Sequence, residues 1–356
     1  MEAKGITATV VFESSAVNRD EKISGNTASI KKLSRIDGTY SFMSRAFIRH
    51  HMFESLNKLY DWHAAPVELS KNVIQFSFPD ANVVTYPEMD FFGFMSTVSD
   101  TAARKAPLGI TKAVSLEPWQ GDMAFYANHD MVRRAMEGGK EKATPDPHSK
   151  EEHFSYYKVS FTLDLQRIGL QDLYFEGELK NNIKNWMENL PEAEQNEVEE
   201  KAAKEDKAEG GFQWRRIEVD GNLFGYVGIK AEDKYSLVRF ITTKEEFKKR
   251  IEQVLTIIKD GIFMHSSTEN YGIKPVFMVA AALKLPVPIF NSSIKLIKNS
   301  NVYGLDATPI LKDVENSYVI KSWYWSNEML PVFGSLKDKV AEWESVKKIL
   351  EEAGIH

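Results

Sequence analysis

The stretch Ile6-Thr7-Ala8-Thr9-Val10-Val11-Phe12 decides how this chain begins to fold. Apolar side chains at every second position, from Ile6 to Phe12, indicate a β-strand with one face in a core. A polar segment rich in lysine and arginine runs from Asn18 to Gly38, and a helical pattern follows Ser41. The chain therefore opens with a strand, a basic loop and a helix.

The expected helix carries two arginines on its apolar side. Wound at 100° per residue, that side collects Phe42, Ala46, Met52, Phe53, Leu56, Leu59 and Tyr60. Arg45 and Arg49 fall among these positions, one turn apart, where unpaired charge is costly. Free amides and the helix dipole make a helix N-terminus an anion site. We therefore expect both arginines to lie where the helix start leaves the core and meets an anion.

Basic residues gather around this helix start although the chain is acidic. Six Lys and Arg and one acid, Asp37, lie between Lys22 and Arg49, whereas the whole chain has a net charge of −6. Residues 188–209 hold nine acids against three lysines, so this segment alone carries the −6 surplus (3 − 9 = −6). The acidic total is thus compatible with a phosphate-binding surface.

Composition limits the class of protein. At 356 residues the chain can form two average domains or one domain with long insertions, and 43% hydrophobic residues suffice for a core. Without cysteine it has neither disulfides nor thiolate metal sites. We find no run of about 18 apolar residues and no signal-peptide h-region. We therefore expect a soluble, cytoplasmic protein.

Further elements follow from periodicity and turn residues. Proline and glycine punctuate residues 117–153, which predicts a projecting arm with residues 122–128 as one leg of a hairpin. Thr243 and Glu246 form a capping box that opens an amphipathic helix. We also expect strands at 72–78, 158–165 and 275–283, an acidic helix and a hairpin (213–219 with 223–229) within an insertion at 171–240, a polar loop at 263–274 and a terminal helix at 336–353. Without its insertions the order is that of a split βαβ, RNA-recognition-type fold.

Three further groups of residues are candidates for RNA contacts. Arg104 and Lys105 lie in a polar loop, where simple solvation is the alternative. The hydroxyl, imidazole and amide groups that bind phosphates and 2′-hydroxyls well recur at His265, Ser266, Ser267 and Asn270. Apolar faces that can stack on bases, or pack on a neighbouring subunit, come from Met123, Phe125 and Tyr126 on the arm.

Catalytic motifs are absent from the sequence. It has no phosphate-binding loop of the Gly-x-x-x-x-Gly-Lys type, no Gly-x-Gly-x-x-Gly and no His-Glu-x-x-His. Neither His50-His51 nor Glu151-Glu152-His153 has a familiar metal spacing. Asp20 and Asp37 could hold a metal or orient a hydroxyl, although pairing with Arg19 and Arg35 is the simpler expectation. We expect no catalytic residues, no metal and no cofactor.

These motifs together resemble the Cas-seven family. The matching features are Asn18-Arg19-Asp20, the basic loop, Ser44-Arg45-x-x-x-Arg49 after Asp37-Gly38, and Phe92-Gly93-x-Met95. The resemblance covers about residues 5–60, 88–165 and 243–290 and is nearest to the DevR-like branch of subtype I-B. That family supplies the backbone subunit of type I CRISPR effector complexes (Cascade). Its members often have Gln where this chain has Arg45, which exchanges an amide for a charge.

The resemblance implies an α+β fold: a modified ferredoxin-like, RNA-recognition-type palm with a helical finger insertion and a β-hairpin thumb. The palm would comprise residues 1–60, 88–116, 154–175 and 241–300. The finger region would be 61–87 and the thumb 117–153, with an acidic helix and β-hairpin insertion at 176–240 and a C-terminal strand and helix at 301–356.

The resemblance also implies a function without catalysis. Copies would stack head-to-tail in a helical filament on the crRNA spacer, present it to target DNA and contact other Cascade subunits. The residues expected at the RNA are Arg19, Lys31, Lys32, Arg35, Ser44, Arg45, Arg49, Arg104, Lys105, His265, Ser266, Ser267 and Asn270, with Met123, Phe125 and Tyr126 wedging between bases.

Two alternatives remain open. The first is an endoribonuclease of the same superfamily that uses an aspartate of the Asn18–Gly38 segment. The second is a structural assembly protein without its own grip on nucleic acid. Its basic patch would bind an acidic partner such as residues 188–209 of another copy.

Overall fold

The computed structural model describes residues 2–20, 27–70, 72–97, 102–140, 142–204, 210–266 and 269–356. Its largest element is a nine-stranded sheet in the order β26-β24-β21-β1-β13-β10-β4-β3, with β9 also paired to β13. The strands are β1 (Gly5–Ser15), β3 (Lys32–Arg35), β4 (Gly38–Met43), β9 (Leu108–Ile110), β10 (Ala113–Ser115), β13 (Phe154–Asp164), β21 (Pro275–Leu283), β24 (Val319–Ser326) and β26 (Ala341–Glu342).

The predicted strand at residues 6–12 is confirmed as part of β1, which lies near the centre of this sheet. It pairs antiparallel with β13 and β21, so that Val10 faces Val159 on one side and Met278 on the other. Ile6 and Phe12 are fully buried, and Val11, on the opposite face, is fully buried too. The strand is therefore covered on both faces, which the sequence pattern alone did not predict.

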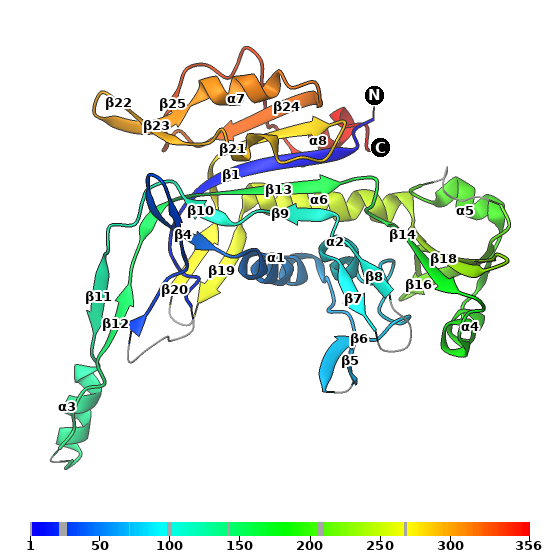
Figure 1. Ribbon diagram of the computed structural model, residues 1–356, viewed down its shortest axis with the longest axis horizontal. Coiled ribbons are helices and arrows are strands. Elements are labelled where there is room, and N and C mark those ends of the chain that lie inside the picture. The colour runs from blue at the N-terminus through cyan, green and yellow to red at the C-terminus, as the bar shows by residue number, and fades with distance from the viewer. Residues whose placement is uncertain are drawn as a thin grey trace.

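Helices cover one face of the sheet (Figure 1). They are α1 (Arg45–Tyr60), α2 (Pro87–Phe92), α6 (Lys244–Asp260) and α8 (Val346–Glu352). The N-cap predicted before α6 is confirmed, because the Thr243 hydroxyl accepts a bond from the amide of Glu246 at 3.2 Å. The other half of the capping box is not formed, since the Thr243 amide donates to the carbonyl of Phe224 and the Glu246 carboxylate accepts from Arg250. The terminal helix is shorter than expected, since α8 spans only part of residues 336–353.

The apolar side expected for α1 is partly wrong. The helix buries Ile48, His51, Met52, Ser55 and Leu56, whereas Leu59 is 62% exposed. The buried polar groups are satisfied: Ser55 Oγ donates to the carbonyl of His51 at 2.8 Å and accepts from the amide of Phe263 at 3.1 Å. Hydrophobicity alone does not identify buried polar residues such as His51 and Ser55 as part of the core. The prediction therefore placed the buried side of the helix incorrectly.

A C-terminal lobe covers the other face of the sheet (Figure 1). It contains β22 (Leu296–Asn299), β23 (Val302–Asp306), β25 (Val332–Phe333), α7 (Ala307–Val314) and the short helix η2 (Ile289–Asn291). Phe290, Leu305 and Ile310 pack there on the outer side chains of β1 and β21. The chain thus forms three layers, with helices, sheet and lobe stacked on one another.

A long arm projects from the edge of the sheet, at the lower left of Figure 1. Strand β11 (Met123–Tyr126) pairs antiparallel with β12 (His148–Glu151), which also pairs with β2 (Thr27–Ala28). Helix α3 (His129–Glu137) lies at its tip and has no buried residue. The hairpin leg expected at residues 122–128 is confirmed.

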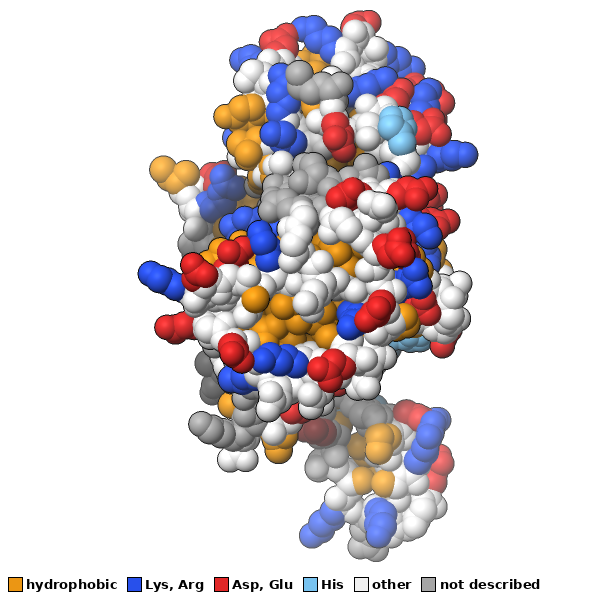
Figure 2. Space-filling model, turned by 90° about the vertical axis from the view of Figure 1, so that its right-hand side faces the viewer, with side chains coloured by type: hydrophobic (Ala, Val, Ile, Leu, Met, Phe, Trp, Pro, Cys, Tyr) orange, Lys and Arg blue, Asp and Glu red, His pale blue; other side chains and the backbone are white. Residues whose placement is uncertain are grey.

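A second sheet lies at the opposite end of the molecule. It consists of β14 (Leu170–Glu176), β15 (Glu192–Ala193), β16 (Gln213–Val219), β17 (Asn222–Ala231) and β18 (Tyr235–Thr242), with α4 (Asn181–Glu188) and α5 (Gln195–Lys201). The predicted hairpin is confirmed, but two short helices replace the single acidic helix. Figure 2 shows acidic and basic side chains interspersed over this end, without a surface of one sign.

Three small hairpins complete the fold. They are β5 (Val67–Ser70) with β6 (Val73–Phe76), β7 (Phe94–Ser96) with β8 (Ala102–Arg104), and β19 (Ile262–Ser266) with β20 (Glu269–Ile273). The last replaces the polar loop expected at residues 263–274. Among the described residues, no helix has both the length and the apolar character needed to cross a membrane.

Candidate nucleic-acid interface

Two short polar bonds fix the start of α1. The side chain of Asn18 accepts from the amide of Ser44 at 2.8 Å. The Ser44 hydroxyl in turn accepts from the amide of Phe47 at 3.2 Å and caps the helix. The loop after β1 and the first turn of α1 are therefore held together by a contact that the sequence did not predict.

Arg45 is the exposed cation at this helix start. Within the described ranges it has no carboxylate at ion-pairing distance. Partial burial lowers the pKa of its guanidinium, and the neighbouring charge of Arg49 lowers it further. A cation that feels only repulsion gains directly when an anion approaches. Arg45 therefore has the properties expected of a phosphate ligand.

Arg49 already has a partner in its own chain. Its guanidinium lies 3.1 Å from Glu88 Oε1 and 5.0 Å from the centre of the Phe92 ring. The other oxygen of Glu88 accepts from the amide of Ala65 at 3.2 Å, which holds the carboxylate in place. Arg49 therefore ties α1 to α2, and an RNA phosphate would have to compete with Glu88.

Arg19 is enclosed by the base of the arm. Its guanidinium contacts both carboxylate oxygens of Glu152 at 3.1 Å and the carbonyl of Glu151 at 2.5 Å. Glu269 of β20 lies 3.7 Å away. Only 15% of the Arg19 side chain is exposed, so its chief contacts join the loop, the arm and the β19–β20 hairpin.

The remaining cations of the basic loop that the structure describes are paired as well, and Lys22 lies outside the described residues. Lys31 bonds to Asp20. Lys32 lies 2.6 Å from Glu151 Oε1 and 3.9 Å from the centre of the Trp119 ring. Arg35 and Asp37 lie 3.7 Å apart with about half of each side chain exposed, as expected from sequence.

The sequence count of six cations against one acid therefore overstated the local charge. The compensating carboxylates come from α2, the arm and β20, which are distant in sequence and close in space. Two acidic residues of the 188–209 segment, Glu192 and Glu197, are likewise paired within the chain. A hydrogen bond from Arg216 lowers the pKa of Glu197, and Glu192 lies 2.7 Å from Arg215.

Arg104 and Lys105 lie in different environments. The Arg104 side chain is only 6% exposed and pairs with the fully buried Asp90. It also donates to the carbonyls of Leu170 and Arg167, each at 2.7 Å. Arg104 is therefore an interior residue that joins α2 to the start of β14, whereas Lys105 is exposed.

The segment at residues 263–274, predicted as a polar loop, contains the β19–β20 hairpin, which lies beside α1. His265 pairs with Asn270 across its end, and both residues are exposed. The His265 ring stacks on Phe263, with ring centres 6.1 Å apart. Ser266 belongs to β19, and Ser267 lies outside the described residues. The hairpin brings His265 and Asn270 to the same side as α1, as the interface requires.

The apolar residues of the arm are exposed, as the wedge hypothesis needs. Met123, Phe125 and Tyr126 are 58%, 70% and 41% exposed. Tyr126 is fixed on one side by His148, whose ring centre is 5.3 Å away, while Lys150 lies 5.0 Å from the centre of the Tyr126 ring. Within the described chain, Met123 and Phe125 are open to a base or a neighbouring subunit, whereas His148 and Lys150 already lie against the Tyr126 ring.

One group of possible metal ligands comes together in the described ranges. Donor atoms of His50, His51 and Glu54 lie within 4.8 Å of one another on α1. His51 is buried, and burial lowers the pKa of its ring. His153 is not part of such a group, because its Nδ1 lies 2.7 Å from the Ser41 hydroxyl in the core.

Comparisons with known proteins agree with the fold. A family model described as "CRISPR-associated negative auto-regulator DevR/Csa2" matches residues 6–302. No curated protein matches the sequence. A chain of a "CRISPR RNA-guided surveillance complex, pre-nicking" superposes with a TM-score of 0.55 at 8% identity and covers 98% of this chain and 100% of its own. A chain of another "CRISPR RNA-guided surveillance complex" has a TM-score of 0.50, 9% identity and 98% and 99% coverage.

These chains share the mixed α/β fold, and the family model spans most of the sequence. The resemblance that the opening motifs suggested is therefore confirmed, and this chain belongs to the DevR/Csa2 family of CRISPR-associated proteins.

Proposed function

We propose that this chain is a non-catalytic backbone subunit of a type I CRISPR surveillance complex, where it holds the guide RNA along its spacer. The observation that carries the proposal is Arg45, an exposed guanidinium without a carboxylate partner in the described chain, in the first turn of a capped helix. The positive helix end and Arg45 together favour a phosphate at this point.

A guide must remain free to pair with target DNA. A subunit that grips phosphates and 2′-hydroxyls leaves the base edges exposed and accepts any guide sequence. Arg45, His265 and Asn270 offer donors of this kind on adjacent elements. Ser44, whose hydroxyl and amide are both engaged, would position the helix start.

The paired cations would contribute less directly. Displacing Glu152 from Arg19, or Glu151 from Lys32, would leave a carboxylate facing the phosphate. We assign these residues, with Lys31 and Arg49, to shaping the interface, whereas Arg35 pairs with Asp37 away from the α1 start. Arg104 would support the palm from within, and Lys105 would add charge at its surface.

In this proposal, the main sheet with α1 and α6 is the palm, residues 61–87 are the finger region, and the arm at residues 117–153 is the thumb. Met123, Phe125 and Tyr126 would wedge between bases held by the next copy. Head-to-tail contacts of this kind generate an open helical filament. Residues 176–240 and 301–356 would lie outside the RNA path.

The test compares Arg45→Ala with Lys347→Ala, a matched removal of an exposed cation on α8. Each variant is purified in the reconstituted complex, and bound RNA is measured across a salt series. Loss of one phosphate contact on a single strand should reduce the slope of log K against log salt by about 0.7. The Arg45→Ala complex should lose RNA and show this smaller slope, whereas Lys347→Ala should match the wild type. Equal slopes in all three proteins would refute the proposal.

A cleavage assay tests the absence of catalysis. Asp20 and Asp37, the aspartates of the basic loop, are engaged with Lys31 and Arg35. The complex incubated with complementary RNA and Mg²⁺ should therefore leave the RNA intact. Periodic cleavage that disappears in Asp20→Ala or Asp37→Ala would favour the endoribonuclease instead.

A further inference from the structure

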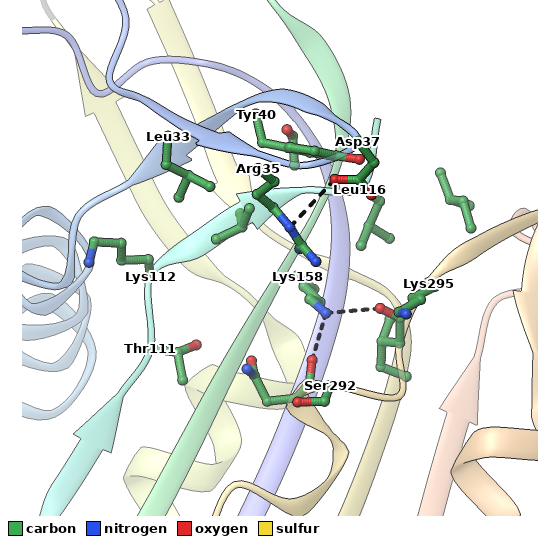
Figure 3. A pocket seen from close by; sticks show the side chains of 15 residues that line it. Leu33, Arg35, Asp37, Tyr40, Thr111, Lys112, Leu116, Lys158, Ser292 and Lys295 are labelled. Carbon is green, nitrogen blue, oxygen red and sulfur yellow. Dashed lines mark hydrogen bonds and ion pairs between the residues drawn. The ribbon is translucent and has the colours of Figure 1, made fainter. Parts of the chain in front are cut away.

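A pocket lies between the main sheet and the loop that enters the C-terminal lobe. Its volume is about 500 Å³, and its walls come from the β3–β4 hairpin, β10, β13 and residues 291–296. Figure 3 shows the cations Arg35, Lys158 and Lys295 converging on it, while the amine of Lys112 points away. We call it the Lys158 pocket.

The pocket is separate from the interface at α1. Tyr157 and Val159 of β13 belong to the core on the helix side of the sheet. Side chains alternate along a strand, so Lys158 lies on the opposite face. Its amine donates to the carbonyls of Asn291 at 2.6 Å and Ile294 at 2.9 Å, both in the loop that leads into the lobe.

Positive charge in the pocket is poorly compensated. In the described ranges, neither Lys158 nor Lys295 has a carboxylate at ion-pairing distance. The acid that lines the pocket is Asp37, which lies 3.7 Å from Arg35 in an exposed pair. Such surface pairs contribute little and open readily. Three cations around one cavity repel one another unless an anion joins them.

The state of Lys158 reflects this environment. Burial, together with the charges of Arg35 and Lys295, lowers the pKa of its amine to about 8. Two of its three hydrogens are used by carbonyls, so one remains for a ligand. Both carbonyls are neutral and leave the charge of the amine in place.

The remaining walls and the size of the pocket point to a ligand larger than phosphate alone. Leu33, Leu116 and Leu296 form apolar parts of the lining, and Tyr40 adds an aromatic ring. Pockets for small organic ligands typically have volumes of about 300–1,000 Å³ and combine apolar walls with a few polar groups. A nucleotide has both a phosphate and a planar base that suit these walls.

We propose that the Lys158 pocket binds a nucleotide through its phosphate, either a free nucleotide or the phosphorylated end of an RNA strand. Lys158, Lys295 and Arg35 hold the phosphate. The base lies against Tyr40 and the leucines. This site does not depend on guide-RNA binding at Arg45, because it is on the other face of the sheet.

The test uses the full chain, purified free of RNA in high salt. Binding of inorganic phosphate, uridine 5′-monophosphate, and a uridine trinucleotide with or without a 5′-phosphate is measured by calorimetry. The variants are Lys295→Glu and the matched charge reversal Lys298→Glu. Both lysines are exposed, and Lys298 is absent from the lining, so both variants should fold.

Lys295→Glu should weaken binding of the monophosphate at least about tenfold, as loss of a hydrogen bond to a charged group does. Lys298→Glu should stay within about twofold, since screened surface charge acts weakly. A trinucleotide that binds only with its 5′-phosphate identifies a strand end, and a monophosphate that binds more tightly identifies a free nucleotide. No binding of any probe, or equal losses in both variants, would overturn the proposal. Arg45→Ala should leave monophosphate binding intact, which separates this site from the guide interface.

Discussion

Replacing Asp90 by Asn should destabilise the fold more than any exposed change of the same kind. The Asp90 carboxylate has no exposed surface and contacts two arginines, Arg104 and Arg250. It also accepts from the amide of Gly169 at 3.0 Å. Arg250 is fully buried as well. Asp90 thus joins α2, β8, α6 and the second sheet through one buried charge.

The size of the effect follows from what remains after the change. Asn keeps the shape of the side chain but removes the negative charge, which leaves two buried guanidinium groups undercompensated. Breaking a buried ion pair in this way costs about 3–5 kcal/mol. Arg250 retains Glu246 at 2.8 Å, and Arg104 retains three carbonyls. We therefore expect a loss near the lower bound, about 3 kcal/mol.

Asp130 provides the matched control. It also pairs with two arginines, Arg133 and Arg134, but both are at least 70% exposed and lie on the free helix α3. Asp130→Asn should therefore cost about 0.5 kcal/mol. Urea unfolding followed by tryptophan fluorescence gives both free energies, since the chain has seven tryptophans. A loss below about 1 kcal/mol for Asp90→Asn, or equal losses in the two variants, would refute the proposed role of the buried network.

Three further outcomes follow from the same structure. The pKa of Lys158 is about 8 in the fold and 10.5 as a free side chain. The unfolded chain therefore holds more protons between these values, and stability should rise with pH across that window in the wild type but less in Lys158→Met, as measured by urea midpoints. Burial lowers the pKa of His51 from its ordinary 6.5, so stability should fall as the pH drops below 6.5, and His51→Gln should reduce that fall. Phe125 is 70% exposed, so Phe125→Ser should change stability by less than about 0.5 kcal/mol, whereas sedimentation should detect shorter assemblies on RNA.

Local patterns predicted the elements that local forces determine. The alternation in β1, the cap of α6 and the turn between β16 and β17 each depend on neighbours within a few residues. Local patterns could not predict which residues from distant parts of the sequence pack against each strand. Strands β19 and β20 lie in a polar segment without clear alternation of apolar residues. The sequence therefore predicted a loop there, whereas the two strands pair as a hairpin.

The sequence predicted where the candidate site lies, but it did not predict how much of its positive charge is neutralised by ion pairs. Arg45 lies exposed in the first turn of α1, as the sequence predicted, and the structure adds Asn18, which bonds to the amide of Ser44. The partners of the other cations could not be identified, because Glu88, Glu152 and Glu269 are far away along the chain. The Lys158 pocket was missed for the same reason, since its cations come from β3, β13 and the loop before β22.

This redistribution of charge sets the salt dependence expected of RNA binding. If each of the six basic residues between Lys22 and Arg49 contacted a phosphate, the slope per subunit would be about −4, at about −0.7 for each contact. If ion pairs within the chain exclude the others and Arg45 alone binds a phosphate there, that region contributes only about −0.7. A shallow slope combined with stable RNA retention would mean that hydrogen bonds, stacking on the arm and contacts between copies carry the affinity. The proposed filament would then hold its guide through many weak contacts repeated along the strand, which would leave each short segment free to pair with DNA.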